Sequence, residues 1–192
     1  SRFIHCTKRS HEIALERIGR HLKKSRGKGL ILKPSKNLDI DCYVDADFCG
    51  LWSREDAHDP VSVKSRTGFA ICIANCPIVW SSRLQNLISL STMESEYVAL
   101  SEALKFALPI QNLVQTVAKG VGLPPERLAT FKTAIWEDNM GALTLGKLEP
   151  GRCTPRSKHC AVKTHWFRSY LKPNHIEIMK IDAKEQRADM LT

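Results

Sequence analysis

Three strand-like runs follow one another before any long helical run begins, and this order restricts the fold more than any other feature of the sequence. Residues 38–48, 67–74 and 77–82 are rich in β-branched and aromatic residues, and the short turn between the last two predicts a hairpin. From Tyr97 to Val117 the apolar residues instead recur with a period of 3.6, which predicts a long helix. The chain therefore begins its main body with an antiparallel arrangement.

Two further alternations of strand and helix complete the order β-β-β-α-β-α-β-α. The later strands are predicted at 133–137 and 176–181, with helices near 139–145, 158–171 and from Lys184 onward. A hairpin followed by right-handed crossovers gives a mixed sheet, because a crossover connection makes its two strands parallel. The prediction is an α/β fold with a five-stranded mixed sheet flanked by helices.

Positive charge is concentrated in two parts of the chain. Residues 1–36 hold eleven Lys and Arg against two Glu, a net charge of +9, whereas residues 37–192 balance. Residues 11–24 within the first part have the spacing of an amphipathic helix. A second basic stretch, residues 152–172, contains no acid. Such segments favour a polyanionic partner, nucleic acid above all, although solvated surface charge is the alternative.

The overall composition is that of a globular protein, with 43% hydrophobic and 26% charged residues. No apolar run approaches the roughly 20 residues needed to cross a bilayer, and the start SRFIHCTKRS has no signal-peptide core. We therefore expect an intracellular protein without a membrane partner.

Asp45 and Asp47 lie one residue apart in the predicted first strand, so their side chains point to the same face. One interpretation is a turn at the strand end, where carboxylates accept hydrogen bonds from backbone amides. The other is a metal site, because gathered carboxylates repel one another unless a hard cation such as Mg²⁺ neutralises them.

Three further acids are predicted to reach the same place. Asp138 ends the strand TAIWED, at the carboxyl edge where open α/β sheets bind ligands. Glu96 lies in the first turns of the long helix, and Asp189 in those of the terminal helix. If the first strand is central, these three can meet Asp45, and four carboxylates suit two divalent cations about 3.5–4 Å apart.

The sequence resembles the ribonuclease H domain of copia-type LTR retrotransposons, preceded by the last stretch of their reverse transcriptase. The resemblance rests on several runs that occur in order over nearly the whole chain: SRFIH…ALERIGRHLK, YVDADFCG, SRTGFAICIANCPIVWSS, LSTMESEYVALSEA, WEDNMGAL, RSKHCAVKTHWFR and EQRADMLT. It implies that residues 1–36 are the reverse transcriptase segment and residues 37–192 a ribonuclease-H-like domain.

The resemblance also implies an activity, the hydrolysis of the RNA strand of RNA–DNA hybrids. Asp45, Glu96, Asp138 and Asp189 would be the catalytic acids and the ligands of two Mg²⁺ ions, with Mn²⁺ as a substitute, and the products would carry 5′-phosphate and 3′-hydroxyl ends. Glu96 matches the family pattern better than Glu94. The implied setting is reverse transcription in a cytoplasmic virus-like particle, with the reverse transcriptase of the same polyprotein as partner and no oligomer required.

Substrate contacts are predicted from residues beside the acids and from the basic stretch. Ser91, Thr92 and Asn139 could read the 2′-hydroxyl of RNA, although helix capping explains Ser91 and Thr92 equally well. Phosphate contacts, which are independent of sequence, are predicted for four basic residues: Arg156, Lys158, Lys163 and Arg168.

Two departures from the family pattern stand out. Met140 occupies a position where many relatives have glutamine, so one polar contact to the hybrid is missing. Residues 181–189 contain no histidine, whereas cellular ribonucleases H carry one in a loop before the last aspartate. His159 is the candidate replacement, because a crossover helix starts at the carboxyl ends of the strands. The alternative is that His159 simply lies at a helix start.

A second function class remains open from the sequence. Retroelements also keep ribonuclease-H-like folds that have lost their acids and serve as connectors or nucleic-acid tethers. A complete acid set favours the enzyme.

Overall fold

The computed structural model describes the whole chain except residues 1–6, 56, 125, 127–130 and 153–164. It separates into two compact units, Ser1–Leu32 and Lys33–Thr192. In the first unit the predicted amphipathic helix is confirmed as α1, Arg9–Lys24. None of its residues is buried, and Ile13, Ile18 and Leu22 are all more than half exposed.

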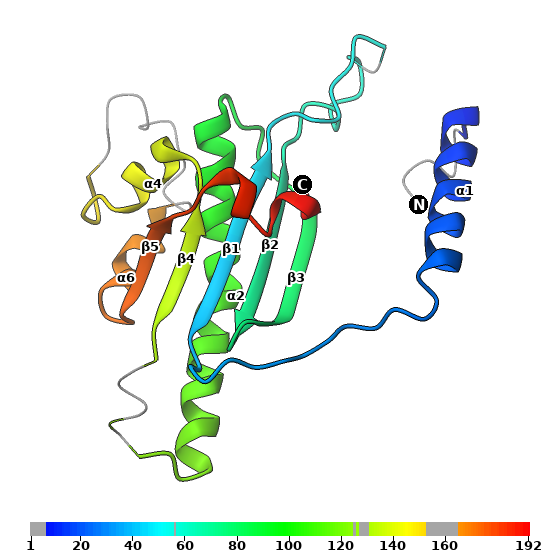
Figure 1. Ribbon diagram of the computed structural model, residues 1–192. Helices are drawn as coiled ribbons and strands as arrows, with labels where there is room; N and C mark the ends of the chain where they lie inside the picture. Colours follow the sequence, from blue (N-terminus) through cyan, green and yellow to red (C-terminus); the bar gives the residue numbers. More distant parts are fainter. Residues whose placement is uncertain (1–6, 56, 125, 127–130, 153–164) are drawn as a thin grey trace. The chain divides into compact units, whose positions relative to one another are not determined.

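The second unit is built on the predicted five-stranded mixed sheet (Figure 1). Its strand order is β3-β2-β1-β4-β5, with β1 antiparallel to β2, β2 antiparallel to β3, and the β1–β4 and β4–β5 pairs parallel. The strands are β1 Ile40–Asp47, β2 Arg66–Ile73, β3 Cys76–Leu84, β4 Thr133–Glu137 and β5 Ile176–Lys180. This is the strand arrangement of a ribonuclease-H-like fold, so the predicted fold class is confirmed.

The central position of β1 follows from its sequence. In IDCYVDAD the side chains of both faces are apolar or half-buried up to Val44, and polarity increases only toward the carboxyl end. A strand that is covered on both faces suits the middle of a sheet. The polar end of β1 therefore projects at one edge, and the apolar part anchors it.

Helix α2, Thr92–Gly120, covers one face of the sheet and contributes more residues to the main core cluster than any other single element (Figure 1). Ser91 caps it, because its Oγ accepts a hydrogen bond from the Glu94 N–H at 3.2 Å. The buried part of α2 contains Tyr97, Leu100, Ala103, Leu104 and Ala107, which pack against the inner side chains of the strands.

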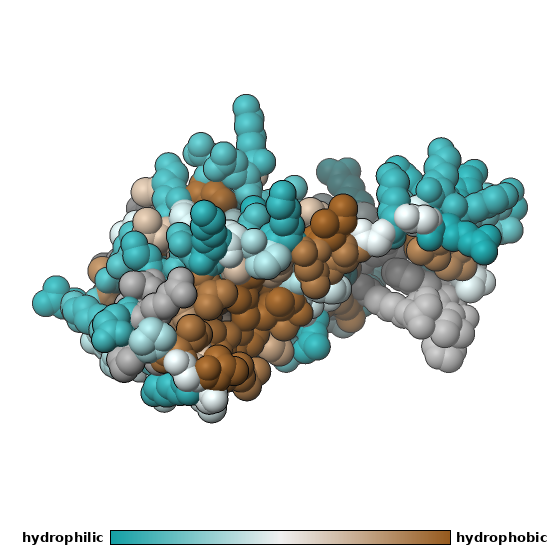
Figure 2. All heavy atoms as spheres, turned by 60° about the horizontal axis from the view of Figure 1, so that its bottom comes forward, coloured by the Kyte–Doolittle hydropathy of each residue, from teal (hydrophilic) through white to brown (hydrophobic). Residues whose placement is uncertain are grey.

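The second half of α2 differs from its sequence-based prediction. Because proline lacks a backbone N–H, Pro109 was expected to kink or restart the helix, but α2 is assigned as one helix through it. Leu113 and Val117 were expected on the buried face but are 61% and 55% exposed. That part of the helix lies beyond the sheet, where no strand can cover it (Figure 1). Figure 2 brings the corresponding end of the molecule forward and shows hydrophobic side chains gathered there.

Two short helices follow β4. The first, α4 Met140–Gly146, matches the prediction and is capped by Asn139. The second, α6 Arg168–Leu171, is shorter than the helix predicted over residues 158–171. Residues 158–164 fall outside the described residues, and Trp166 and Phe167 form a turn, so the prediction was wrong there.

The predicted terminal helix is wrong. The last residues form two short 3₁₀ turns, Ala183–Glu185 and Asp189–Leu191, and Ala188 packs with Tyr43 and Cys72 on the sheet face opposite α2. Gln186 between them is buried, and its Nε2 donates to the carbonyl of Val44 at 2.7 Å. The ladder between β1 and β4 ends at the Tyr43–Trp136 pair, so Gln186 supplies a donor just where pairing stops.

No helix among the described residues is long and apolar enough to span a bilayer.

The contact between Gln186 and β1 gives a testable prediction. Gln186→Leu replaces the amide with an apolar side chain of similar size and leaves the buried Val44 carbonyl without its donor. We expect the free energy of unfolding to fall by about 1–3 kcal/mol, the cost of an unsatisfied buried polar group. Urea denaturation measures it, with Lys184→Ala in the neighbouring exposed turn as control. Equal midpoints for Gln186→Leu and the wild type would contradict the prediction.

Candidate active site

Three acids converge at the carboxyl end of β1. Asp45 lies near the end of β1, Glu96 in the second turn of α2, and Asp138 directly after β4. The parallel pairing of β1 and β4 puts their carboxyl ends at one edge, where α2 also begins. One carboxylate oxygen from each residue lies within 4.8 Å of those of the other two. The predicted convergence therefore occurs for Asp45, Glu96 and Asp138.

Asp189, the fourth predicted acid, lies at the rim of the same hollow. It belongs to an exposed 3₁₀ turn and not to the first turns of a longer helix. The hollow has a volume of about 460 Å³, and its lining also includes Asp45, Glu96, Thr92 and Thr192. Asp189 is near enough to contribute to the raised pKa of Asp138. Its place as a metal ligand stays a prediction.

The electrostatics of the site disfavour several negative charges without a cation. Burial raises the pKa of Glu96 to about 10, and the charges of Glu137, Asp45 and Asp138 act in the same direction. Burial also raises the pKa of Asp138, with Asp45 as the next cause. The Oε2 atom of Glu96 is buried and has no hydrogen-bond partner among the described residues. A bound cation would give this oxygen a partner and offset the repulsion.

The donor set fits a hard divalent cation. All ligand atoms are carboxylate oxygens, which Mg²⁺, Mn²⁺ and Ca²⁺ prefer over the nitrogen and sulfur ligands typical of zinc. Partial exposure of the hollow leaves space for water and for substrate oxygens in the coordination sphere. These residues could therefore hold the metal ions that the sequence predicts.

Glu137 is a buried acid that the sequence-based reasoning did not single out. It is 0% exposed and points into the core beside α2, because residues 133, 135 and 137 alternate inward along β4. Its Oε1 accepts from the Asn139 N–H at 3.0 Å, while burial raises its pKa to about 9. The inward alternation of TAIWE was the signal that could have identified it.

The two aspartates at the end of β1 have different surroundings. Asp45 is 9% exposed, whereas Asp47 is half-buried. The Asp47 carboxylate lies so close to Gly50 that a Cβ at residue 50 would collide with it. Asp47 therefore lies against the turn after β1, and it also borders the hollow.

The residues predicted to contact the 2′-hydroxyl lie beside the acids, but two of them already cap helices. Ser91 caps α2, and the Asn139 side chain accepts from the N–H groups of Gly141 and Ala142 at the start of α4. Thr92 lines the hollow. The Asn139 amide oxygen accepts two capping bonds, so its NH₂ group remains for a substrate. The Ser91 hydroxyl accepts one capping bond, so its O–H and its second lone pair remain.

The structure describes only one of the residues predicted as phosphate contacts in the basic stretch, residues 152–172. Arg156, Lys158, His159 and Lys163 lie outside the described residues. The prediction that Arg168 binds phosphate was wrong: its side chain is 3% exposed, and its Nη1 donates to the carbonyl of Arg152 at 2.8 Å. A buried guanidinium that is bonded to backbone carbonyls serves the fold and is not accessible to a substrate.

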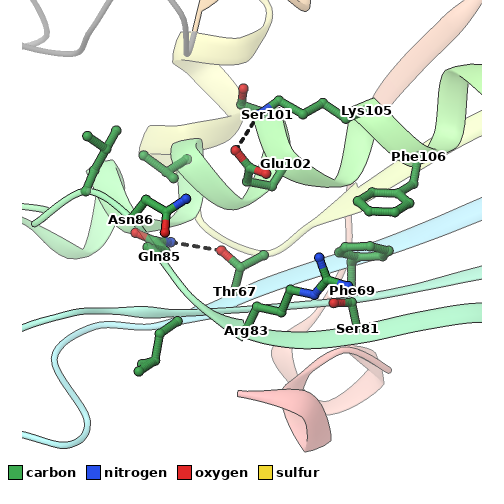
Figure 3. A pocket seen from close by; sticks show the side chains of 13 residues that line it. Thr67, Phe69, Ser81, Arg83, Gln85, Asn86, Ser101, Glu102, Lys105 and Phe106 are labelled. Atoms are coloured by element: carbon green, nitrogen blue, oxygen red, sulfur yellow. Dashed lines mark hydrogen bonds and ion pairs between the residues drawn. The ribbon is translucent and has the colours of Figure 1, made fainter. Parts of the chain in front are cut away.

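A second cleft lies between α2 and the strands β2 and β3 (Figure 3). Phe69 and Phe106 contact each other along it with ring centroids 5.0 Å apart. At its other end the buried Gln85 donates to Thr67 Oγ1 at 3.0 Å and to the Ser95 carbonyl at 2.9 Å. None of the four predicted acids lines this cleft, whereas Asp45, Glu96 and Asp189 line the hollow at the end of β1.

Similar proteins were found by sequence and by structure, while no family model matches the chain. The chain is 29% identical over 192 residues to the retrovirus-related Pol polyprotein from transposon TNT 1-94 of Nicotiana tabacum, and 28% identical over 197 residues to that from transposon RE1 of Arabidopsis thaliana. Each match covers 100% of this chain but only 13% and 12% of the respective polyprotein.

Several solved structures with partial likeness are ribonucleases H. LC11-RNase H1, isolated from compost by a metagenomic approach, has a TM-score of 0.48 and 16% identity, covering 80% of this chain and 92% of that one. The same enzyme in complex with an RNA/DNA hybrid has a TM-score of 0.47 and 16% identity, covering 80% and 93%.

The full-length sequence matches, taken with the strand order observed in the second unit, identify this chain as a homologue of the retrovirus-related Pol polyproteins of plant transposons that carries a ribonuclease-H-like fold.

Proposed function

We propose that the Lys33–Thr192 unit is an endoribonuclease that hydrolyses the RNA strand of RNA–DNA hybrids and leaves 5′-phosphate and 3′-hydroxyl ends. The observation that carries the proposal is the convergence of Asp45, Glu96 and Asp138 within 4.8 Å at the carboxyl edge of the sheet. Homology to Pol polyproteins supports it, since these relatives belong to retroelements.

Each acid has a task in this proposal. Asp45, Glu96 and Asp138 would hold two Mg²⁺ ions, with Asp189 at the rim as the fourth ligand. When bound, such ions supply a water of lowered pKa and stabilise the charge that develops on the departing oxygen. Thr92 and the amide of Asn139, both beside the acids, are the candidates for contacts to the 2′-hydroxyl that distinguishes RNA from DNA.

The proposal extends to partners and setting. The substrate is an RNA–DNA hybrid, the reverse transcriptase of the same polyprotein is the protein partner, and residues 1–36 are its last stretch. The expected place of action is a cytoplasmic virus-like particle, and the mechanism needs one copy of the chain. The tether function gains no support, since the acids needed for cleavage are present and three of them converge.

Incubation with a hybrid labelled on the RNA strand, with and without Mg²⁺, tests the proposal directly. We expect Mg²⁺-dependent cleavage of the RNA strand of the hybrid, and no cleavage of duplex RNA or duplex DNA. Binding of the hybrid without cleavage, at any Mg²⁺ concentration, would instead favour the tether.

Asp45→Asn tests the metal assignment. The substitution keeps the size of the side chain but removes a charge and a ligand oxygen. Loss of a residue that only orients a ligand costs about 10–100-fold in metal affinity or activity, so loss of a direct ligand should reduce turnover by at least about 100-fold. Hybrid affinity should persist, because basic residues elsewhere contact the phosphates.

Asp47→Asn is the matched control for Asp45→Asn, since the same change is made two residues away on the same strand face. Single-turnover cleavage and equilibrium binding separate the two effects. Equal losses of cleavage in both variants would show that Asp45 was wrongly chosen over Asp47.

The raised pKa values predict how stability depends on pH without metal. Glu96 binds a proton more tightly in the folded state, where its pKa is about 10, than in the unfolded state, where it is near 4.5. The folded state then holds more protons between these values, so stability is greatest at low pH and falls as the pH rises from about 5 toward 10.

Urea denaturation at pH 5.5, 7 and 8.5 in the presence of a chelator measures this slope. Glu96→Gln should flatten it, because an amide does not titrate. Added Mg²⁺ should stabilise the wild type more at pH 8.5 than at pH 5.5, since ligand carboxylates must lose their protons to bind metal. A stability that rises with pH in the absence of metal would contradict the assignment.

Hybrid binding should depend on salt and on the basic stretch. Replacing Lys158 and Lys163 with Ala should weaken binding and lower the slope of log affinity against log salt by about 1 for each phosphate that is no longer neutralised. Arg168→Ala is the contrasting variant, because it removes hydrogen bonds of a buried guanidinium and should lower thermal stability. An unchanged salt slope in the double lysine variant would show that these two charges take no part in binding the hybrid.

A further inference from the structure

Gly68 leaves a notch beside the first catalytic acid. It pairs with Asp45 in the β1–β2 register, so it is the position on β2 directly opposite that aspartate. A Cβ at residue 68 would lie 2.7 Å from Thr192 Cγ2, 2.9 Å from Leu191 Cβ and 3.0 Å from the Ala188 carbonyl oxygen. The absence of a side chain on β2 is therefore what lets the last residues of the second unit pack against the end of β1.

Thr192 uses this notch to reach Asp45. Its Oγ1 donates to Asp45 Oδ2 at 2.6 Å, and the same hydroxyl lies 3.0 Å from the backbone carbonyl of Asp189. A hydroxyl has one hydrogen, and the shorter contact is to the carboxylate, whose charge strengthens the bond. Thr192 thereby links the end of β1 to the turn that carries the fourth predicted acid.

This hydrogen bond can fix the orientation of the Asp45 carboxylate. The carboxyl groups of Glu96 and Asp138 lie close by. The like charge of Asp138, joined by that of Glu96 once Glu96 has lost its proton, favours rotation of an unrestrained Asp45 side chain away from the cluster. A donor on Oδ2 opposes that rotation and leaves the other oxygen of Asp45 to a cation. Partners that orient a metal ligand in this way commonly change metal affinity about 10–100-fold when they are removed.

We propose that Thr192, seated in the notch at Gly68, is a positioning residue that holds Asp45 in its metal-binding orientation. The inference rests on the proposed function, because it takes the acid cluster to be a divalent-cation site.

Calorimetric titration with Mn²⁺, in the absence of nucleic acid, tests the inference with two variants at residue 192. Thr192→Val has nearly the same shape but no hydroxyl, whereas Thr192→Ser keeps the hydroxyl and loses a methyl group. We expect Thr192→Val to weaken Mn²⁺ binding about 10-fold or more, and Thr192→Ser to bind like the wild type. In cleavage, Thr192→Val should need more Mg²⁺ for half-maximal rate and regain most of its turnover at high Mg²⁺.

A purely structural role for Thr192 gives a different result. Loss of packing would affect the valine variant least and the serine variant more, and it would lower the unfolding midpoint without changing metal affinity at temperatures where the protein is folded. Equal Mn²⁺ affinity in Thr192→Val and the wild type, or equal losses in the valine and serine variants, would overturn the inference.

Gly68→Ala approaches the same contact from the other strand. The added methyl group should displace Thr192 without altering Asp45 chemically, and metal affinity should fall as it does in Thr192→Val. The double variant should lose little more than either single one, since both break the same interaction. Gly120→Ala is the matched control, because a Cβ at residue 120 meets nothing within 4 Å.

The outcomes distinguish this inference from the proposed function. If the wild type binds Mn²⁺ and cleaves hybrid while Thr192→Val behaves identically, only the role of Thr192 is refuted. If the wild type binds no divalent cation and cleaves no hybrid, both are refuted.

Discussion

β1 has an antiparallel neighbour, β2, on one side and a parallel neighbour, β4, on the other. This arrangement determines where the other elements of the second unit begin and end. β2 and β3 form a meander on one side, so β3 runs in the same direction as β1 and ends at the same edge. α2 begins at that edge and runs back across the sheet, while β4 arrives there from the other side of β1. The end of β1, the start of α2 and the end of β4 are thus forced together, and each brings one acid.

The carboxylates that meet there are tolerated because the surrounding fold is anchored elsewhere. The core beneath them is apolar, with Val44, Tyr97, Leu100 and Ile135 all fully buried. Glu96 and Glu137 each bury an oxygen without a hydrogen-bond partner among the described residues. Unpaired buried polar groups lower the free energy of unfolding, and a bound cation would offset part of this loss. Function and stability therefore compete at this edge of the sheet.

Local patterns predicted most of the framework and three members of the site. The order of strands, the capped start of α2 and the strand that ends in Asp138 are local properties, and the convergence of Asp45, Glu96 and Asp138 follows from them through topology. Burial that depends on distant segments was harder to predict. Leu113 and Val117 have helical periodicity but extend past the sheet, and Arg168 looks like a surface cation until its carbonyl partners are known. Gln186 has no periodic signal at all, because its role is set by two strands far away in sequence.

The two 3₁₀ turns at the end of the second unit also determine at which stage of folding the site is complete. Gln186 contacts Val44 across 142 residues of sequence, and Thr192 contacts Asp45 across 147. Contacts between residues so far apart in sequence form late, because closing a long loop lowers the entropy of the chain before the contact contributes any stabilisation. The two turns follow all five strands and α2 in the sequence, so they are synthesised after them. The acid cluster therefore reaches its full set of contacts only after the last residue of the Lys33–Thr192 unit is in place.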